Sequence, residues 1–326
     1  MNRTSSTLLA AALIALVLPA ATVSAADKPF PKISYTPSGS APEGFTIGKG
    51  TTAYNGSLDG SIYKLDLRTG QGQVLVDKDP NADVANGTCL VLGMRVDPRT
   101  NYLFVAGCDS GSAYVYDADN GALIMEYQLS TSGTPIINDL AITRDAVYFT
   151  DAAQPFVYRL PLSDNGRIPL DPGAATAITL PQEFAIDPAD FCCGANGIVA
   201  TPDGKTLVIG HSNLSTLYRI DVATYDVDAI SVDSPLEDFL DGIAMAGHTL
   251  YIMTPRFPPY VDEIQVVELD KGMLSGRRLP SIKDPQLDGV ASGAIFGSSL
   301  YVNNARYFEF PGGDTEYWIT KLAIRP

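Results

Sequence analysis

Residues 195–221 read ANGIVATPDGKTLVIGHSNLSTLYRID, and this stretch decides the fold. Two apolar, β-rich runs are joined by the turn residues Pro202, Asp203 and Gly204, and a third run begins at Tyr218. Short runs separated by such turns form antiparallel hairpins, and no apolar stripe with the 3.6-residue period of a helix is present. The stretch therefore predicts three consecutive antiparallel strands.

The same unit of a hairpin followed by a strand recurs along the chain. The hairpins read FTIGKGTTAYNG, VLGMRVDPRTNYLFVAG, LAITRDAVYFTD, IVATPDGKTLVIGH, IAMAGHTLYIMT and GAIFGSSLYVNN. The strands that follow them begin near Tyr63, Tyr114, Tyr158, Tyr218, Gln265 and Tyr317. Their spacing of 44 to 60 residues is close to the length of one four-stranded propeller blade. Six repeats predict six blades.

The predicted fold class is all-β: a six-bladed β-propeller that forms a single domain over residues 26–326. A β-sandwich also has many short strands, but it does not explain a six-fold repeat of hairpin plus aromatic strand. No Ser-rich linker, charge block or low-complexity stretch divides the chain, and all-β folds of this size often stay single domains. The extended residues 32–35 are expected to add a strand that closes the ring.

The N-terminus has the pattern of a secretory signal peptide. Arg3 precedes an apolar run over residues 8–21, and Val23, Ser24 and Ala25 supply the small residues of a cleavage site. The run is shorter than the ~20 apolar residues that span a bilayer. We therefore expect residues 1–25 to be removed and the protein to be secreted and extracellular, or periplasmic in a bacterium.

The charge balance limits the partners. The formal net charge of −15 becomes −16 when Arg3 leaves with the signal peptide. Such an acidic chain disfavours nucleic acid and anionic membranes as partners. We expect a monomer that acts on a small molecule.

Four cysteines in a secreted chain favour disulfides over a zinc site. Cys89 and Cys108 flank the hairpin that turns at residues 97–101, so they are expected to pair across it. Cys192 and Cys193 are compatible with free thiols, with a bond to each other or with pairs elsewhere. Sequons at Asn55, Asn86 and Asn213 would make the chain a glycoprotein if the host glycosylates them.

Four polar residues recur at one register of the repeat, just ahead of a short apolar strand. They are Glu43, Asn138, Asn196 and Asp241. The innermost strands of a propeller start at one face of the central channel, so these side chains are expected to form a ring at its mouth. The matching positions of blades two and six, near Leu92 and Ala291, are apolar or small. The ring is therefore polar on one side and leaves room for a substrate on the other.

Two carboxylates and two amides form a donor set that suits a hard cation. The ring predicts a metal-binding site for one divalent cation, with Ca²⁺ preferred and Mg²⁺, Mn²⁺ or Zn²⁺ compatible. The alternative is structural, because Asn-Asp, Asn-Gly and Asp-Gly pairs are common turn formers. Turn preference does not select one face of a ring, so the shared register favours the site.

These motifs resemble the metal-binding motifs of the senescence-marker-protein, gluconolactonase and luciferin-regenerating-enzyme family. The resemblance is carried by PEG at Glu43, IND at Asn138, ANGIVATPDGKTLVIG from Ala195 and LDGIAM from Leu240. The Asn-Asp and Ala-Asn-Gly-Ile motifs are also similar to those of the calcium-dependent paraoxonase lactonases. The resemblance covers the whole mature chain in blade count and order. It implies a six-bladed propeller that binds one catalytic divalent cation, and an enzyme that hydrolyses a lactone or related ester.

The resemblance also implies roles for single residues. The cation would be held by Glu43, Asn138, Asn196 and Asp241, and Asp241 would also supply the general base. His211 is a second candidate for proton transfer, and a loop histidine bonded to the backbone is the alternative. The histidine pair of paraoxonase-like enzymes is not matched, because His248 falls in a turn expected at the opposite face.

Residues that follow the second strands return to the face of the ring. The substrate-binding candidates are Asn55, Arg256, Asn304 and Arg306, with Asp151 at the same position in blade three. For the two arginines the alternative is a solvated surface side chain. An apolar lid over a hydrophobic substrate is predicted from Phe257, Tyr260, Tyr307, Phe308 and Phe310, with packing between loops as the alternative.

The leading hypothesis is thus a secreted, metal-dependent hydrolase, a lactonase or esterase. Two alternatives keep the same site. One is a propeller enzyme that catalyses a non-hydrolytic step of a biosynthetic pathway, such as a cyclisation or pericyclic reaction. The other is a binding protein whose ion is structural.

Overall fold

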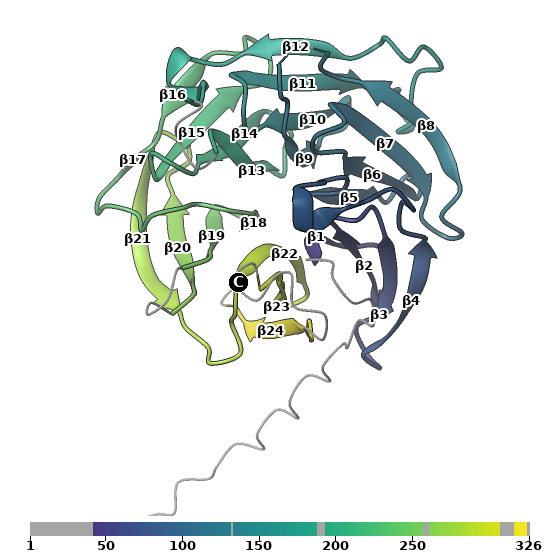
Figure 1. The fold of residues 1–326 in the computed structure, drawn as a ribbon. Helices are drawn as coiled ribbons and strands as arrows, with labels where there is room; N and C mark the ends of the chain where they lie inside the picture. The colour runs from purple at the N-terminus through teal and green to yellow at the C-terminus, as the bar shows by residue number, and fades with distance from the viewer. Residues whose placement is uncertain (1–41, 132, 188–192, 257–260, 307–315, 325–326) are drawn as a thin grey trace, which may run out of the picture. The chain divides into compact units, whose positions relative to one another are not determined.

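The computed structural model describes residues 42–131, 133–187, 193–256, 261–306 and 316–324. Over these residues the chain forms a six-bladed β-propeller, which confirms the predicted fold class (Figure 1). Besides strands, the described residues contain two 3-10 turns, η1 (Val84–Asn86) and η2 (Gln182–Phe184), and no α-helix. In the same ranges no helix is long and apolar enough to cross a membrane. The predicted signal peptide, the boundary after it and the predicted strand at residues 32–35 lie outside the described residues.

The six sheets follow the chain order of the six repeats. Blade 1 contains β1 (Pro42–Ile47), β2 (Thr52–Ser57), β3 (Ile62–Asp66) and β4 (Gln71–Val76). Blade 2 contains β5 (Met94–Asp97), β6 (Tyr102–Ala106), β7 (Ser112–Asp117) and β8 (Leu123–Gln128). Blade 3 contains β9 (Ile137–Ile142), β10 (Ala146–Asp151), β11 (Phe156–Pro161) and β12 (Thr176–Thr179). Blade 4 contains β13 (Ala195–Ala200), β14 (Thr206–His211), β15 (Thr216–Asp221) and β16 (Val227–Ala229). Blade 5 contains β18 (Ile243–Ala246), β19 (Thr249–Thr254), β20 (Glu263–Leu269) and β21 (Ser275–Ile282), with β17 (Ser231–Val232) added in parallel to β21. The described strands of blade 6 are β22 (Val290–Phe296), β23 (Ser299–Asn304) and β24 (Ile319–Ala323).

The first strand of each blade is its innermost strand. β1, β5, β9, β13, β18 and β22 each contact the first strand of the next blade, and β22 contacts β1, so the ring is closed (Figure 1). Because all six run in the same direction, their first residues meet at one mouth of the central channel and their last residues meet at the other. This direction explains why one register of the repeat defines one end of the channel.

Apolar side chains between neighbouring blades form the core. Between blades 3 and 4, for example, Tyr148 packs in one buried cluster with Ile209 and Tyr218. Tyr158, which leads the third strand of blade 3, is buried in the cluster shared with blade 2. The aromatic residues of the repeat therefore pack between neighbouring blades. Their burial stabilises the folded state by about 1.5 to 3 kcal/mol per large side chain.

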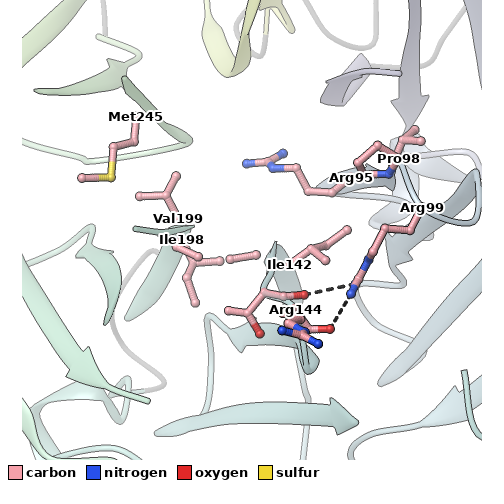
Figure 2. A pocket seen from close by; sticks show the side chains of 12 residues that line it. Arg95, Pro98, Arg99, Ile142, Arg144, Ile198, Val199 and Met245 are labelled. Carbon is pink, nitrogen blue, oxygen red and sulfur yellow. Dashed lines mark hydrogen bonds between the residues drawn. The ribbon is translucent and has the colours of Figure 1, made fainter. Parts of the chain in front are cut away.

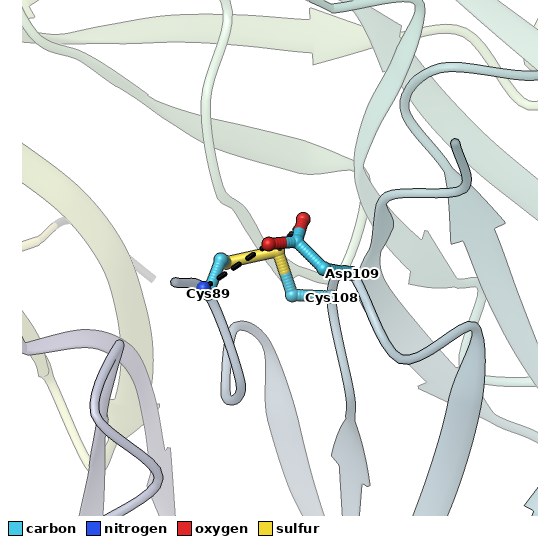
Figure 3. Close-up of side chains that lie close together, drawn as sticks. All are labelled: Cys89, Cys108 and Asp109. Atoms are coloured by element: carbon cyan, nitrogen blue, oxygen red, sulfur yellow. Dashed lines mark hydrogen bonds between the residues drawn. A yellow bond between two sulfur atoms is a disulfide. The ribbon is translucent and has the colours of Figure 1, made fainter. Parts of the chain in front are cut away.

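The predicted disulfide between Cys89 and Cys108 is present, and Figure 3 shows it beside Asp109. The Asp109 carboxylate accepts the backbone N–H of Cys89 at 3.1 Å, and Cys108 forms a β-bridge with Ile137. These three residues do not form a thiolate metal site, because the two sulfurs are bonded to each other. Cys193 is also disulfide-bonded, and Cys192 lies outside the described residues.

The three sequons differ in accessibility. Asn55 is buried, and its Nδ2 donates to the carbonyl oxygen of Gly44 at 2.8 Å. Asn86 and Asn213 are exposed. A glycan on Asn55 is therefore incompatible with the folded blade, whereas the other two positions leave room for one.

Candidate functional site

A ring of six residue pairs surrounds one mouth of the channel, and we call these the ring pairs. They are Glu43–Gly44, Leu92–Gly93, Asn138–Asp139, Asn196–Gly197, Asp241–Gly242 and Ala291–Ser292. The register is the one expected from the sequence: the backbone N–H of Gly93 donates to Asn138, and that of Gly242 donates to Ala291. The structure thus brings the four predicted polar residues to one level of the channel.

Each ring pair is a β-bulge. In blades 1, 3, 4 and 6 the pairing register shifts so that the two residues of the pair face one residue of the second strand. In blade 5 the same geometry is made by Met253, which exchanges backbone hydrogen bonds with both Asp241 and Gly242. Ala106 does so with the pair of blade 2. A bulge redirects side chains that would otherwise alternate between the faces of a sheet, so it presents the polar residue of the pair at the channel mouth.

The glycine of a ring pair allows neighbouring blades to touch. A Cβ atom added to Gly197 would lie 2.4 Å from the carbonyl oxygen of Asp241, and one added to Gly44 would lie 2.0 Å from that of Leu92. Gly93 and Gly242 are equally close to the next blade. The pairs EG, NG and DG are therefore close contacts between strands, not the turns of the alternative interpretation.

Side chains at the ends of second strands hold the ring backbone. The hydroxyl of Thr150 donates to the carbonyl oxygen of Asn196 at 2.8 Å and accepts the N–H of Asp139 at 3.0 Å. The hydroxyl of Ser212 donates to the carbonyl oxygen of Leu240, directly before Asp241, at 2.5 Å. The bonds to Asn196 and Leu240 hold the ring backbone of the following blade, and the bond to Asp139 lies within blade 3.

Three carboxylates and one guanidinium share the centre of the ring. Burial raises the pKa of Glu43 well above its ordinary value of 4.5, Asp241 and Asp139 raise it further, and Arg95 lowers it. Burial also raises the pKa of Asp139, while Arg95 lowers it. Arg95 lies within reach of Asp139, with 3.3 Å between its Nη2 and Oδ2 of the carboxylate. Three carboxyl groups are thus held close together in a buried place, an arrangement that is found most often at functional sites.

Three oxygen atoms in the ring are buried without a hydrogen-bond partner among the described residues. They are Oε2 of Glu43, Oδ1 of Asp139 and Oδ1 of Asn196. Leaving a buried polar atom unpaired costs about 1 to 3 kcal/mol, so three such atoms at one level indicate a ligand that accepts their lone pairs. A cation fits this donor set, because every unpaired atom is an oxygen and a lone-pair donor.

Asp139 and Arg95 were not among the candidates from the sequence. Asp139 follows Asn138 in the same bulge, and its position next to a predicted ligand is the one signal that pointed to it. Arg95 lies in β5, and its neighbour Asp139 belongs to the next blade. No local pattern connects the two residues.

Three of the polar residues predicted at the ends of second strands are hydrogen-bonded within the protein. Asn304 is buried, accepts the N–H of Asp288 at 2.8 Å and donates to the carbonyl oxygen of Trp318 at 2.9 Å. Asn55, described above, holds the backbone of β1 through Gly44. Asp151 accepts three backbone N–H groups of its own loops. These contacts are structural, so we leave these residues out of the proposed site.

The two candidate arginines are paired within the protein. Arg256 lies 3.3 Å from Glu237. Arg306 donates to Asp288 at 2.8 Å and stacks over the ring of Trp318. The five aromatic residues of the predicted lid lie outside the described residues.

His211 is buried and held by the backbone through both ring nitrogens. Nδ1 accepts the N–H of Leu214 at 3.3 Å, so Nε2 carries the proton and donates to the carbonyl oxygen of Glu183 at 2.8 Å. Burial lowers the pKa of His211 below its ordinary value of 6.5. These backbone contacts are those of the alternative interpretation, although His211 is the last residue of β14 and does not lie in a loop, and we therefore leave it out of the proposed mechanism. His248 lies in the turn between β18 and β19, at the end of the blade opposite Asp241, as expected.

The opposite mouth of the channel contains a cavity of about 490 Å³. Figure 2 shows Arg95, Ile198, Val199 and Met245 among the residues that line it. The guanidinium of Arg99, at the rim, is bound by Asp97 and by backbone carbonyl oxygens of the next blade. Arg95 lines this cavity and also contacts Asp139, so it lies between the ring and the cavity.

No protein-family profile matches the chain, and no curated protein matches it in sequence. Many solved structures share its fold. The major allergen Mala s 1 of Malassezia sympodialis is 15% identical with a TM-score of 0.61, over 89% of this chain and 95% of the allergen. Regucalcin from Agrobacterium tumefaciens, a calcium-binding protein, is 15% identical with a TM-score of 0.58, over 88% of this chain and 95% of regucalcin. The WD40 repeats of RRP9 are 10% identical with a TM-score of 0.59, over 91% and 98% of the two chains. At these identities the comparisons show the propeller fold, which supports many unrelated functions.

Proposed function

We propose that this protein binds one divalent cation at the ring and hydrolyses a lactone or related ester there. The unpaired buried oxygens of Glu43, Asp139 and Asn196 carry the proposal. With all groups ionised, three carboxylates and the guanidinium of Arg95 give the centre a net charge of −2. One divalent cation would neutralise this charge, and buried charges are stable only when they are paired or coordinate a metal.

The residues of the ring would hold the cation through oxygen atoms, from Glu43, Asn138, Asn196 and Asp241. Mixed carboxylate and amide oxygens suit Ca²⁺, which takes six to eight oxygen ligands and completes its shell with water. The shared fold with a calcium-binding propeller supports this choice. Such a cation, when bound, would polarise the ester carbonyl and stabilise the charge that develops on its oxygen.

The chain itself would supply the proton transfer and the surroundings. Asp241 would accept the proton of the attacking water, the role that the family resemblance implies. With His211 committed to the backbone, a carboxylate is the better candidate for this base. The ring residues Glu43, Asn138, Asn196 and Asp241 are 3 to 6% exposed, which limits the water that competes for them.

Cation binding is tested first, by calorimetric titration of chelator-treated protein with CaCl₂. We expect one site in the wild type and its loss in Asp241→Ala. Asp151→Asn is the matched control, because Asp151 is a buried carboxylate whose oxygens are already hydrogen-bonded. A wild type that binds no divalent cation would refute the site.

Hydrolysis is tested with a panel of lactones and esters, with and without chelator. Turnover that stops with chelator and returns with Ca²⁺ is the expected result, and equal rates in both conditions exclude a cation-dependent mechanism. Binding of the cation without turnover of any substrate would favour a binding protein with a structural ion. We also propose that the protein is extracellular and acts as a monomer; the Cys89–Cys108 disulfide is compatible with that location.

A further inference from the structure

We infer that Arg95 is a built-in counter-ion that limits the ring to one divalent cation, and that its removal opens a second cation position beside Asp139. The inference rests on the proposed function and extends it, because Arg95 is not a ligand of the cation. It assigns Arg95 the role of setting how much positive charge the site accepts.

The guanidinium of Arg95 is fixed at the inner edge of the ring. Its Nη1 donates to the carbonyl oxygen of Met94 at 2.8 Å, and its Nη2 lies 3.3 Å from Oδ2 of Asp139. The Arg95 side chain is 19% exposed and that of Asp139 is 4% exposed. The positive charge is therefore largely desolvated, and a desolvated charge acts on its neighbours more strongly than a surface ion pair.

The contact with Arg95 involves only one of the two carboxylate oxygens of Asp139. Its Oδ2 accepts the backbone N–H of Ile198 at 3.3 Å in addition to Arg95, whereas Oδ1 is buried without a partner among the described residues. A carboxylate has about four lone-pair positions. Without the guanidinium, Oδ2 would keep only the N–H of Ile198 and Oδ1 would stay unpaired, so the carboxylate would favour a small cation in place of Arg95.

The count of charges decides the effect. With all groups ionised, the wild-type centre has a net charge of −2 and is neutral after one divalent cation binds. Without Arg95 the centre has a net charge of −3, so one divalent cation leaves a buried negative charge. A trivalent ion, or a second divalent ion, would then be preferred. Replacing Asp139 by Asn gives a net charge of −1, and combining both changes restores −2.

The location of Arg95 also indicates how a second cation would reach Asp139. Arg95 lines the cavity at the opposite mouth (Figure 2), so its removal connects that cavity of about 490 Å³ with Asp139. A second cation would enter from this side and would not have to pass the ring.

The test compares Ca²⁺ and Tb³⁺ binding to four variants by calorimetry and by terbium luminescence. Arg95→Lys keeps the charge and should bind one Ca²⁺ as the wild type does. Arg95→Met should prefer Tb³⁺ over Ca²⁺ at least tenfold more than the wild type, or bind a second Ca²⁺. Asp139→Asn should weaken Ca²⁺ binding about tenfold, and the double variant Arg95→Met with Asp139→Asn should return to within about threefold of the wild type.

Several outcomes overturn the inference. A folded Arg95→Met variant with wild-type stoichiometry and wild-type preference for Ca²⁺ does so, as does a double variant that binds as weakly as Asp139→Asn. If Arg95→Met does not fold, the double variant decides: its folding supports the counter-ion, because the uncompensated charge is then gone, and its failure to fold makes Arg95 purely structural. A wild type that binds no cation refutes the proposed function, while the folding of the double variant still tests the charge balance.

Discussion

The side-chain amide of Asn303 ties Glu43 into the ring. Nδ2 of Asn303 donates to the carbonyl oxygens of Pro42 and Glu43 at 2.8 and 2.7 Å, and Oδ1 accepts the N–H of Ser292 at 2.7 Å. Asn303 and Glu43 are separated by 260 positions in the chain. One side chain thus joins the last blade to the first at the level of the site, so the direction of Glu43 depends on blade 6.

Asn303→Ala is expected to destabilise the protein and to weaken cation binding together. It leaves buried backbone groups of three residues unpaired, which costs about 2 to 4 kcal/mol in urea unfolding. We expect Ca²⁺ affinity to fall by about tenfold or more, because Glu43 is no longer held in place.

Asn304→Ala is the matched control for this prediction. Asn304 is the buried neighbour of Asn303. Its amide bonds to the backbone of Asp288 and Trp318, and neither residue belongs to a ring pair. It should lose a comparable stability and keep its Ca²⁺ affinity. Equal affinities in Asn303→Ala and the wild type would show that Glu43 does not need this anchor.

The sequence predicted the blade count and the ring register, because both depend on local patterns. Hairpin turns can be recognised in short stretches such as residues 195–221, and the spacing of these stretches along the chain gives the number of blades. Asn138 and Asn196 could be located in the same way, since each occupies a fixed place before a second strand that is easy to recognise.

Contacts between blades could not be predicted. Arg95 and Asp139 belong to different repeats, and their pairing depends on how the blades pack. The same holds for polar residues at strand ends: the side chains of Asn304 and His211 bond to the backbone of Asp288 and Glu183, and no local signal in the sequence predicts these contacts.

Gly197→Ala is expected to disrupt the contact between blades 4 and 5. The added Cβ would lie 2.4 Å from the carbonyl oxygen of Asp241, so the backbone has to move. We expect a loss of about 1 to 3 kcal/mol in urea unfolding. Gly173→Ala is the control, because its nearest neighbour is Oδ1 of Asp171 at 3.5 Å, and it should change stability by less than about 0.5 kcal/mol. Similar losses in the two variants would contradict the close packing of the ring.

His211 is expected to make stability depend on pH. Its folded-state pKa is lowered by burial below the ordinary value of 6.5, so the neutral form is favoured in the fold. The stability from this group is fully present above about pH 6.5 and is lost as the pH falls from there through the folded-state pKa. Protonation places a hydrogen on Nδ1, where it opposes the N–H of Leu214.

Thermal unfolding at pH 7.5 and pH 5.5 checks this dependence. His211→Gln should be less stable than the wild type at pH 7.5 and should lose less stability on acidification. His248→Gln is the matched control, since His248 is exposed, and it should follow the wild type at both values. A His211→Gln variant with the wild-type pH dependence would refute the assignment.

Glu43→Gln is expected to be more stable than the wild type without the cation and less stable than the wild type with it. Without cation, the change replaces a buried carboxyl group, whose pKa is raised by burial and by Asp241 and Asp139, with a neutral amide. We expect this variant to be about 1 kcal/mol more stable than the wild type at pH 7 in chelator, because a binding site sacrifices stability for function. With Ca²⁺ at 100 times its Kd, the wild type should gain about 2.7 kcal/mol and the variant much less, so the wild type becomes the more stable protein.

Asp109→Asn, a change outside the ring, should gain as much from Ca²⁺ as the wild type does. If Glu43→Gln and the wild type respond equally to Ca²⁺, Glu43 does not hold the cation, and the unpaired oxygens of the ring need another explanation.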